Sequence, residues 1–137
     1  MEIDFSQLSW VAVLVSVVVG QIVSTLWFVV LFGEPWAREY GVASSKEHTK
    51  EVPPYTYAVG IACTAALAIS LAVLQGAFGV TGIGGALKLA GFVSVGLCIA
   101  TGVPGQAFLR RWRVASIACG SQVAMIFAMS VVLVLVG

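Results

Sequence analysis

Charged residues are scarce in this sequence of 137 residues: 9% are Asp, Glu, Lys or Arg, whereas 60% are hydrophobic. A soluble domain carries about 25% charged residues, and a small domain exposes much of its surface. So few charges cannot cover such a surface in water, which excludes an ordinary soluble globule and favours lipid as the solvent. The net charge of +1 also gives no indication of a nucleic-acid partner.

Aspartate, glutamate and histidine are missing from the long apolar stretches of the chain. Proton-coupled transporters and pumps usually place such groups inside the membrane, and general acid–base catalysis needs the same residue types. The single histidine, His48, lies in the charged segment SSKEHTKE, where we interpret it as solvated. The sequence therefore favours a protein that is not an enzyme.

Cysteine is also rare, and the spacing of the three cysteines is not that of a metal-binding motif. Cys63, Cys98 and Cys119 lie in three different apolar stretches, and no Cys-x-x-Cys occurs. Thiolates together with Met125 and Met129 would suit a cuprous ion, but cysteine is also a common small buried residue. We therefore expect no metal site and no cofactor.

The sequence does contain four long apolar stretches, at about 8–32, 55–76, 84–108 and 114–136. A helix of roughly 20 residues crosses about 30 Å of hydrocarbon, so each stretch is long enough to span a membrane. Backbone polar groups in lipid must be satisfied within the segment, which requires helices. We predict an all-α, polytopic membrane protein: one domain, 1–137, with four transmembrane helices in a small bundle.

The positive charges predict the orientation of these helices. Six of the seven Lys and Arg residues lie in the first and third loops: Arg38, Lys46, Lys50, Arg110, Arg111 and Arg113. Lys and Arg are enriched in cytoplasmic loops, and Lys88 alone falls on the other side. We predict a multi-pass protein of the cell membrane with both termini on the non-cytoplasmic side.

The segment LWFVVLFGEPWAREYG, residues 26–41, forms the end of the first stretch and the start of its loop. Glu34 and Pro35 can begin a short interfacial helix, and Gly41 can end it. Trp and Tyr are enriched at the headgroup level, so an aromatic belt is one interpretation and a headgroup site is the other. The candidate interfacial residues are Trp27, Trp36, Arg38, Arg110, Arg111 and Arg113.

The same segment resembles a known family. The residues that carry the resemblance are Trp27, Phe32, Gly33 and Trp36, with CGSQVAMIFAM over residues 119–129. They are similar to the bacterial membrane family catalogued as domain of unknown function 1761, whose members also have four spans and this length. Members often have a small residue and a proline where this chain has Val29 and Val30. The resemblance implies a four-helix integral membrane protein and implies no activity.

Each apolar stretch carries small residues at every fourth position, on one helical face. The four sets are Ala12, Ser16, Gly20, Ser24; Ala58, Ala62, Ala66, Ser70; Ala90, Ser94, Cys98, Gly102; and Ser116, Gly120, Ala124, Ala128. Small residues let helices approach closely in lipid, so we expect packing at Gly20, Ala62, Gly102 and Gly120. Because four helices leave much outer surface, we also expect a homo-oligomer or a place in a larger membrane complex.

Polar side chains recur at one depth, roughly 8–15 Å from the cytoplasmic ends of the helices at about 1.5 Å per residue. The candidate layer comprises Gln21, Ser24, Thr25, Thr64, Thr101 and Gln122. One interpretation is hydrogen bonding between helices, with Gln122 bound to Ser24 or Thr25; the other is a small vestibule open to the cytoplasm. Pro104, flanked by two glycines, predicts a kink or break in the third helix.

Three classes of function remain open from these patterns. The first is a self-associating structural or accessory membrane protein, which the small-residue faces and the absence of ionisable groups favour. The second is a passive channel or small-solute carrier formed by an oligomer around the polar layer. The third is a lipid- or metal-binding membrane protein.

Overall fold

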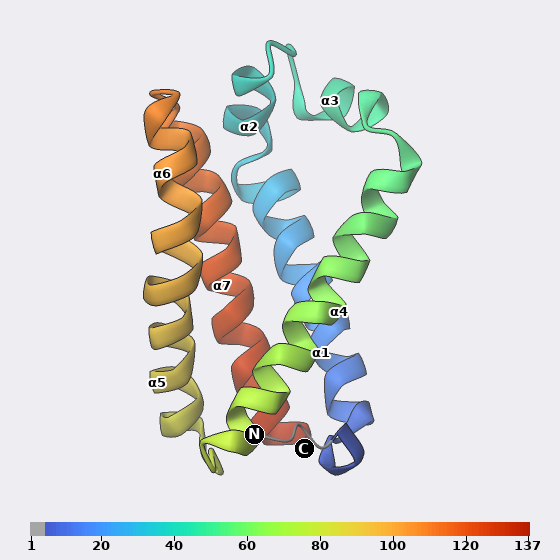
Figure 1. The fold of residues 1–137 in the computed structure, drawn as a ribbon. Helices are drawn as coiled ribbons and strands as arrows, with labels where there is room; N and C mark the ends of the chain where they lie inside the picture. Colours follow the sequence, from blue (N-terminus) through green and yellow to red (C-terminus); the bar gives the residue numbers. More distant parts are fainter. Residues whose placement is uncertain (1–4) are drawn as a thin grey trace.

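The computed structural model describes residues 5–137, and this part of the chain contains helices and no strands (Figure 1). In chain order the elements are the 3-10 turn η1 (Phe5–Gln7), α1 (Trp10–Thr25), the π-helical η2 (Leu26–Leu31), α2 (Gly33–Glu39), α3 (Ser45–Glu51), α4 (Pro54–Ala77), α5 (Ile83–Val93), the π-helical η3 (Ser94–Ile99), α6 (Ala100–Phe108) and α7 (Trp112–Val136). The predicted all-α class is confirmed.

Four helical columns are long and apolar enough to cross a membrane. They are Trp10–Leu31, Pro54–Ala77, Ile83–Phe108 and Trp112–Val136. Their bounds lie within two residues of the predicted stretches, because length and hydropathy set them. The first and third columns each include a π-helical segment, η2 and η3, and the second and fourth are single α-helices.

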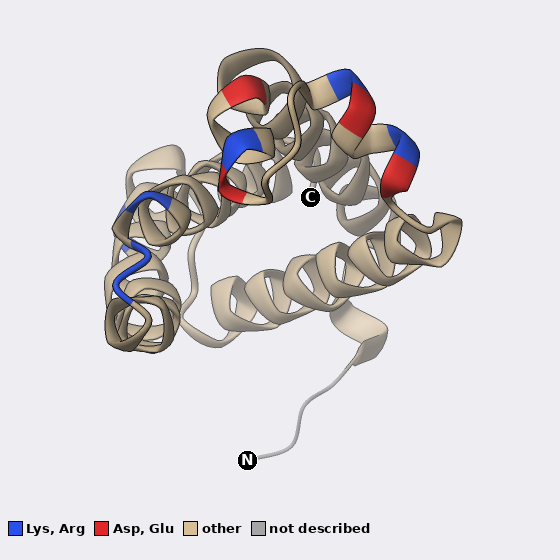
Figure 2. Ribbon diagram, turned by 90° about the horizontal axis from the view of Figure 1, so that it is seen from above, with Lys and Arg blue, Asp and Glu red and all other residues tan. Residues whose placement is uncertain are grey.

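Helix α7 is the centre of the bundle: it contacts α1, α4, α5 and α6, and α4 also contacts α1. The start of α1 and Gly137 lie at one end, which we call the terminal end (Figure 1). Helices α2 and α3 and the α6–α7 loop lie at the other, the charged end. Seen from above, Lys, Arg and Glu of these segments gather at this end (Figure 2).

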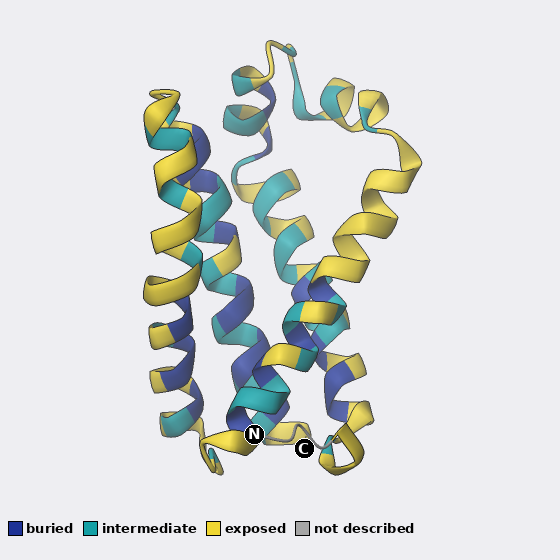
Figure 3. Ribbon diagram, viewed as in Figure 1, coloured by how far each residue is buried: buried dark blue, intermediate teal, exposed yellow. Residues whose placement is uncertain are grey.

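The buried core occupies the terminal half of the bundle, whereas much of α4 and α6 at the charged end is exposed (Figure 3). Its fully or nearly fully buried side chains are Ala12, Val13, Ala68, Leu71, Ala90, Val93, Met125, Ile126, Met129 and Leu133. Gln75 is also buried here, and its Nε2 donates to the Ser130 carbonyl oxygen at 2.8 Å. This bond satisfies a donor that would be costly to leave unpaired in lipid.

The small-residue faces differ in what they contact. Ala12, Ser16 and Gly20 are buried in α1, and a Cβ on Gly20 would lie 2.9 Å from both Met129 Sδ and Thr64 Cγ2. In α4, by contrast, the expected face is exposed, including Ala62. The buried residues of α4 are Thr64, Ala68, Leu71 and Gln75. An alanine-rich helix has small residues on more than one face, so their spacing alone does not identify the buried face. In α4 the buried face is the one that carries the polar contacts of Thr64 and Gln75.

The loop elements include one expected helix and one that was missed. Helix α2 covers the predicted interfacial segment, and Gly41 follows it with φ +73°, a left-handed conformation that favours glycine. Helix α3 lies in a segment interpreted as a solvated loop. Its N-cap Ser44 accepts a hydrogen bond from Glu47 N at 3.3 Å, and the Ser-x-x-Glu spacing was the available signal.

Of the kink or break expected at Pro104, the break is wrong, because the helix continues through this residue to Phe108. The hydrogen-bonding pattern changes earlier, in η3, which ends one turn before the proline. The ring of a helical proline meets the carbonyl four residues before it. For Pro104 this carbonyl belongs to Ala100, the first residue of α6, which directly follows the π-helical segment η3.

Candidate functional site

The indole of Trp27 holds the first span against α7. Its Nε1 donates to the Ile117 carbonyl oxygen at 2.9 Å. The ring also lies on Gly120, where an added Cβ would be 2.6 Å from Trp27 Cζ2. Trp27 is therefore a packing residue as well as a candidate interfacial one, and Gly120 provides the space for its ring.

A chain of aromatic rings links the first span to the charged end. Phe28 contacts Trp36 with ring centroids 4.8 Å apart, Trp36 contacts Tyr40 at 5.3 Å, and Tyr40 contacts His48 at 4.9 Å. The Arg111 guanidinium lies 5.8 Å from the Tyr40 ring centroid, within cation–π range. Trp36 and Arg111, both candidate residues, thus meet through Tyr40.

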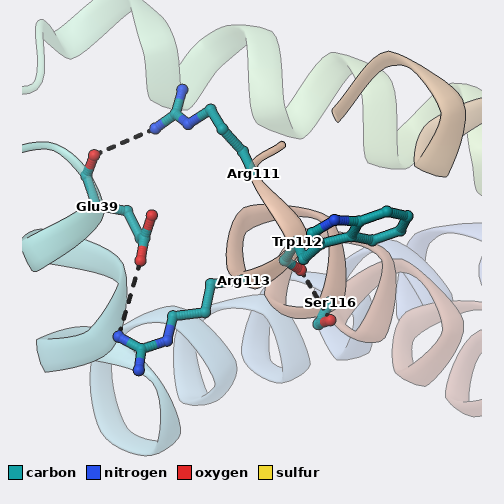
Figure 4. A network of polar contacts seen from close by, with 5 residues as sticks. All are labelled: Glu39, Arg111, Trp112, Arg113 and Ser116. Carbon is teal, nitrogen blue, oxygen red and sulfur yellow. Dashed lines mark hydrogen bonds and ion pairs between the residues drawn. The ribbon is translucent and has the colours of Figure 1, made fainter. Parts of the chain in front are cut away.

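Glu39 lies between two of the candidate arginines (Figure 4). Arg111 Nη2 donates to the Glu39 carbonyl oxygen at 3.1 Å, and Arg113 Nη1 lies 4.0 Å from Glu39 Oε1. The Arg113 side chain is 77% exposed, so this long ion pair contributes little. Arg110, in the same loop, is exposed and has φ 56°. Arg111 therefore joins the α6–α7 loop to α2, while Arg113 is available to other anions.

A cleft of about 650 Å³, which we call the interior cavity, lies between α4, η3, α6 and α7 in the charged half, and it is partly open because Ser70, Thr101 and Gln122 in its lining are exposed. Its polar lining residues are Ser70, Cys98, Thr101, Gln106, Cys119 and Gln122. Leu71, Val93 and Ile126, which also line it, belong to the buried core, so the core closes the cavity toward the terminal end. The volume lies within the range of small-molecule sites, roughly 300–1,000 Å³.

Two amides in this cavity lack partners in the described part of the chain. Gln106 Oε1 is buried with no hydrogen bond, and no bond joins the Gln122 side chain to any described residue, including Ser24 and Thr25. The predicted Gln122 bond is therefore not formed. The Thr101 hydroxyl is already used, because it donates to the Leu97 carbonyl oxygen.

The expected polar layer is split between two places instead of forming one vestibule. Gln21 Nε2 donates to Thr64 Oγ1 at 2.7 Å, and Thr64 Oγ1 donates to the Gly60 carbonyl oxygen at 2.9 Å. This pair ties α1 to α4. Gln21 and Thr25 line a separate groove along α1, and Ser24 is half-buried. Only Thr101 and Gln122 of the predicted set line the interior cavity, because the first span borders it only through Phe28.

Gly102 and Cys119 form the contact between α6 and α7. An added Cβ at Gly102 would lie 3.0 Å from Cys119 Sγ, which supports the predicted role of Gly102 in close packing. All three cysteines are free, and the described residues contain no group of three or more His, Cys, Asp or Glu that could hold a metal. Cys119 acts here as a small packing residue.

Two further hollows border α7. One, of about 520 Å³, is lined by Phe32, Pro35, Arg38, Trp112, Arg113, Ser116 and Ile117. The second, of about 550 Å³, is mostly apolar and includes Trp27, Val103, Gly120 and Ala124. Both include Trp112 and Ser116, so they adjoin. Arg38 and Arg113, two candidate interfacial residues, are thereby brought to one pocket.

Three side chains of the candidate sites were not recognised from the sequence: Gln106, Trp112 and Phe28. Gln106 is one of few amides within an apolar stretch, and this could have identified it. Pro104, two residues earlier, was interpreted instead. Trp112 lies between two arginines in RRWR, which is typical of a membrane interface. Phe28 had no signal of its own, because its contact with Trp36 depends on the π-helical turn η2.

Comparison with known proteins connects the chain to one family. No curated protein and no solved structure matches it. The family described as "Protein of unknown function (DUF1761)" matches residues 11–134, which include all four spans. The match extends over nearly the whole chain and agrees with the resemblance carried by Trp27, Phe32, Gly33 and Trp36. The protein is an integral membrane protein by its four apolar helices, and it belongs to the DUF1761 family.

Proposed function

We propose that this protein binds a small, mainly apolar molecule in the interior cavity of its charged half. The observation that carries the proposal is the buried, unpartnered Gln106 Oε1 in a cavity of about 650 Å³. An unpaired acceptor in an apolar site is costly, and a ligand O–H or N–H group would satisfy it. The unpaired amide of Gln122 in the same lining is a second point of attachment.

A binding site fits these features better than a channel within one chain. The cavity ends at the buried side chains of Leu71, Val93 and Ile126, so it favours holding a molecule over passing it through. The apolar majority of the lining favours a hydrophobic ligand with one hydrogen-bonding group. A channel or carrier formed by several copies is the less supported alternative.

Native mass spectrometry of the protein released from lipid nanodiscs at low activation energy tests the proposal. We expect the wild-type protein to retain a bound small molecule, Gln106→Leu to retain it roughly tenfold less, and Ala118→Phe, which fills the cavity, to exclude it. Ala100→Phe is the matched control, because Ala100 is exposed and lines no cavity. Equal retention in all four proteins, or no retained molecule in any, contradicts the proposal.

Self-association is a second candidate, and the exposed small face of α4 favours it. Ala58, Ala62 and Ala66 lie at spacing four on a surface that the bundle does not cover, and such faces support close helix pairing in lipid. In the same spectra we expect an oligomer that Ala62→Phe converts to the monomer. An oligomer unchanged by Ala62→Phe contradicts this interface.

We also propose that the charged end lies in the cytoplasm of the cell, with both termini outside and no catalytic activity. The six Lys and Arg residues at the charged end support the orientation. The lack of Asp, Glu and His within the spans supports a non-enzymatic role. Cysteine labelling from each side of the membrane, with single cysteines introduced at Ser44 and Gly137, tests the orientation.

A further inference from the structure

The two further hollows that border α7 differ in chemistry but are continuous. The pocket nearer the charged end is lined by the side chains of Arg38 and Arg113. The groove beside it is lined by Trp27, Ile99, Val103, Val123 and other mainly apolar residues. Trp112 and Ser116 belong to both. A cationic pocket thus leads into an apolar groove along one helix.

The charge of the pocket is positive after its internal pairing is counted. Arg38 and Arg113 are both exposed, and the facing carboxylate of Glu39 lies 4.0 Å from Arg113 Nη1. That distance is too long for a strong charge-assisted hydrogen bond. Arg38 has no ion pair with a described residue. The pocket therefore retains capacity for an anion that can contact two guanidinium groups.

The groove has the length of one lipid chain. From Trp112 to Ala124, α7 advances about 18 Å at about 1.5 Å per residue, which is close to half of the roughly 30 Å hydrocarbon thickness. Trp112 is 60% exposed at the boundary between the two hollows, the depth at which tryptophan is enriched. The order from charged end to mid-membrane is therefore cation, aromatic ring, apolar groove.

We propose that this surface of α7 is a binding site for one anionic phospholipid. The phosphate contacts Arg38 and Arg113, and an acyl chain lies in the groove between Trp27 and Val103. The arrangement follows the charge and the polarity of a phospholipid along its length. The site adjoins the interior cavity, because Ala115 and Cys119 line both, but Arg38, Arg113 and Trp112 line only this surface and Ala118 and Gln106 only the interior cavity.

The test uses nanodiscs of phosphatidylcholine with phosphatidylglycerol as a minor component, and native mass spectrometry of the released protein. We expect one phosphatidylglycerol to be retained in preference to phosphatidylcholine. A basic residue near an anionic lipid surface contributes about 1 kcal/mol, so Arg38→Gln and Arg113→Gln should each lower the preference about fivefold, and both together about 25-fold. Glu39→Gln, which frees Arg113, should raise it.

The matched control is Lys46→Gln with Lys50→Gln, which removes the same charge from α3 at the same end. The control should retain the wild-type preference; an equal loss would show a general effect of charge and overturn the site. Ala124→Phe should lower retention of the lipid by obstructing the groove. Ala118→Phe, which fills the interior cavity, should leave it unchanged, so this proposal and the cavity proposal fail separately.

Two further outcomes overturn the proposal. If glycerol 1-phosphate displaces the retained lipid at equal concentration, the pocket recognises a soluble phosphate ester and the groove adds nothing. If no phospholipid survives release while the circular dichroism of each variant remains helical, the surface binds lipid no better than the rest of the bundle.

Discussion

Both halves of this bundle are built from the same four apolar spans, but they differ in packing. In the terminal half, side chains from all four spans, such as Val13, Leu71, Ala90 and Met129, are buried together. In the charged half, the first ten residues of α4 are exposed and a cavity lies between α4 and α7. The difference shows that hydropathy alone does not determine which part of a membrane helix becomes core.

Two buried amides follow the same division, although the buried hydroxyls of Ser94, Ser121 and Ser130 also lack partners. Gln75 in the terminal half bonds directly to a neighbouring helix, whereas Gln106 in the charged half keeps a buried acceptor without a partner. A satisfied amide joins helices, and an unsatisfied one in a cavity marks a place for a ligand. We therefore assign stability to the terminal half and binding to the charged half.

The largest expected effect comes from removing a core side chain of the terminal half. Met129 is fully buried and contacts α1 at Gly20. We expect Met129→Ala to lower the free energy of unfolding by about 3 kcal/mol, because it leaves a cavity among three helices. Unfolding in mixed detergent measures this, with the exposed Phe92→Ala as control. An equal loss of unfolding free energy in Met129→Ala and Phe92→Ala would show that the buried residues are not the main source of stability.

A smaller effect is expected at Trp27, on the boundary between the halves. Trp27→Phe removes the Nε1 hydrogen bond to Ile117 and part of the ring on Gly120. We expect a loss of about 1.5 kcal/mol in the free energy of unfolding. Trp10→Phe, at an exposed tryptophan of the same span, should change it little. A larger loss for Trp10→Phe than for Trp27→Phe would show that α1 is held mainly at the terminal end.

The smallest effect is expected at the charged end, where Arg111 joins the α6–α7 loop to α2. Arg111→Gln removes the bond to the Glu39 carbonyl oxygen and the contact with the Tyr40 ring. We expect about 0.5 kcal/mol of local destabilisation, seen as roughly twofold faster amide exchange in α2. Arg110→Gln should leave exchange unchanged. A large change in global unfolding would show that the charged end is part of the stability core.

The sequence was sufficient for the four spans and the interfacial helix α2, because length, hydropathy and Gly41 act locally. It was insufficient for the faces of the helices. Ala62 and Ala68 are the same residue type on the same helix, yet Ala62 is exposed and Ala68 is fully buried. Which face turns inward depends on contacts with other helices, such as Gln21 with Thr64, that no single segment encodes.

The residues of the candidate sites could largely be predicted from the sequence, but which of them lie together could not. The arginines and tryptophans of the charged end were identified, yet the pairing of Arg38 with Arg113 depends on how α2 lies against α7. Gln122 was identified without its surroundings, and Gln106 was missed. The π-helical turns η2 and η3 shift every following side chain around its helix, so a 3.6-residue period cannot be extrapolated across them.

Helix α4 packs against the bundle mainly through its C-terminal part. Its later part is held by Thr64, Ala68, Leu71 and Gln75, and its first ten residues are exposed, with the Gly60 carbonyl oxygen accepting from Gln21 Nε2 at 3.5 Å. At about 1.5 Å per residue these ten residues extend about 15 Å, so a tilt of about 10° at the fixed part displaces the tip by about 2.6 Å. A change of bond length or angle at the Gln21–Thr64 contact is therefore magnified where α4 joins α3, whereas the part of α4 that lines the interior cavity, Leu67 to Leu74, stays with the fixed portion.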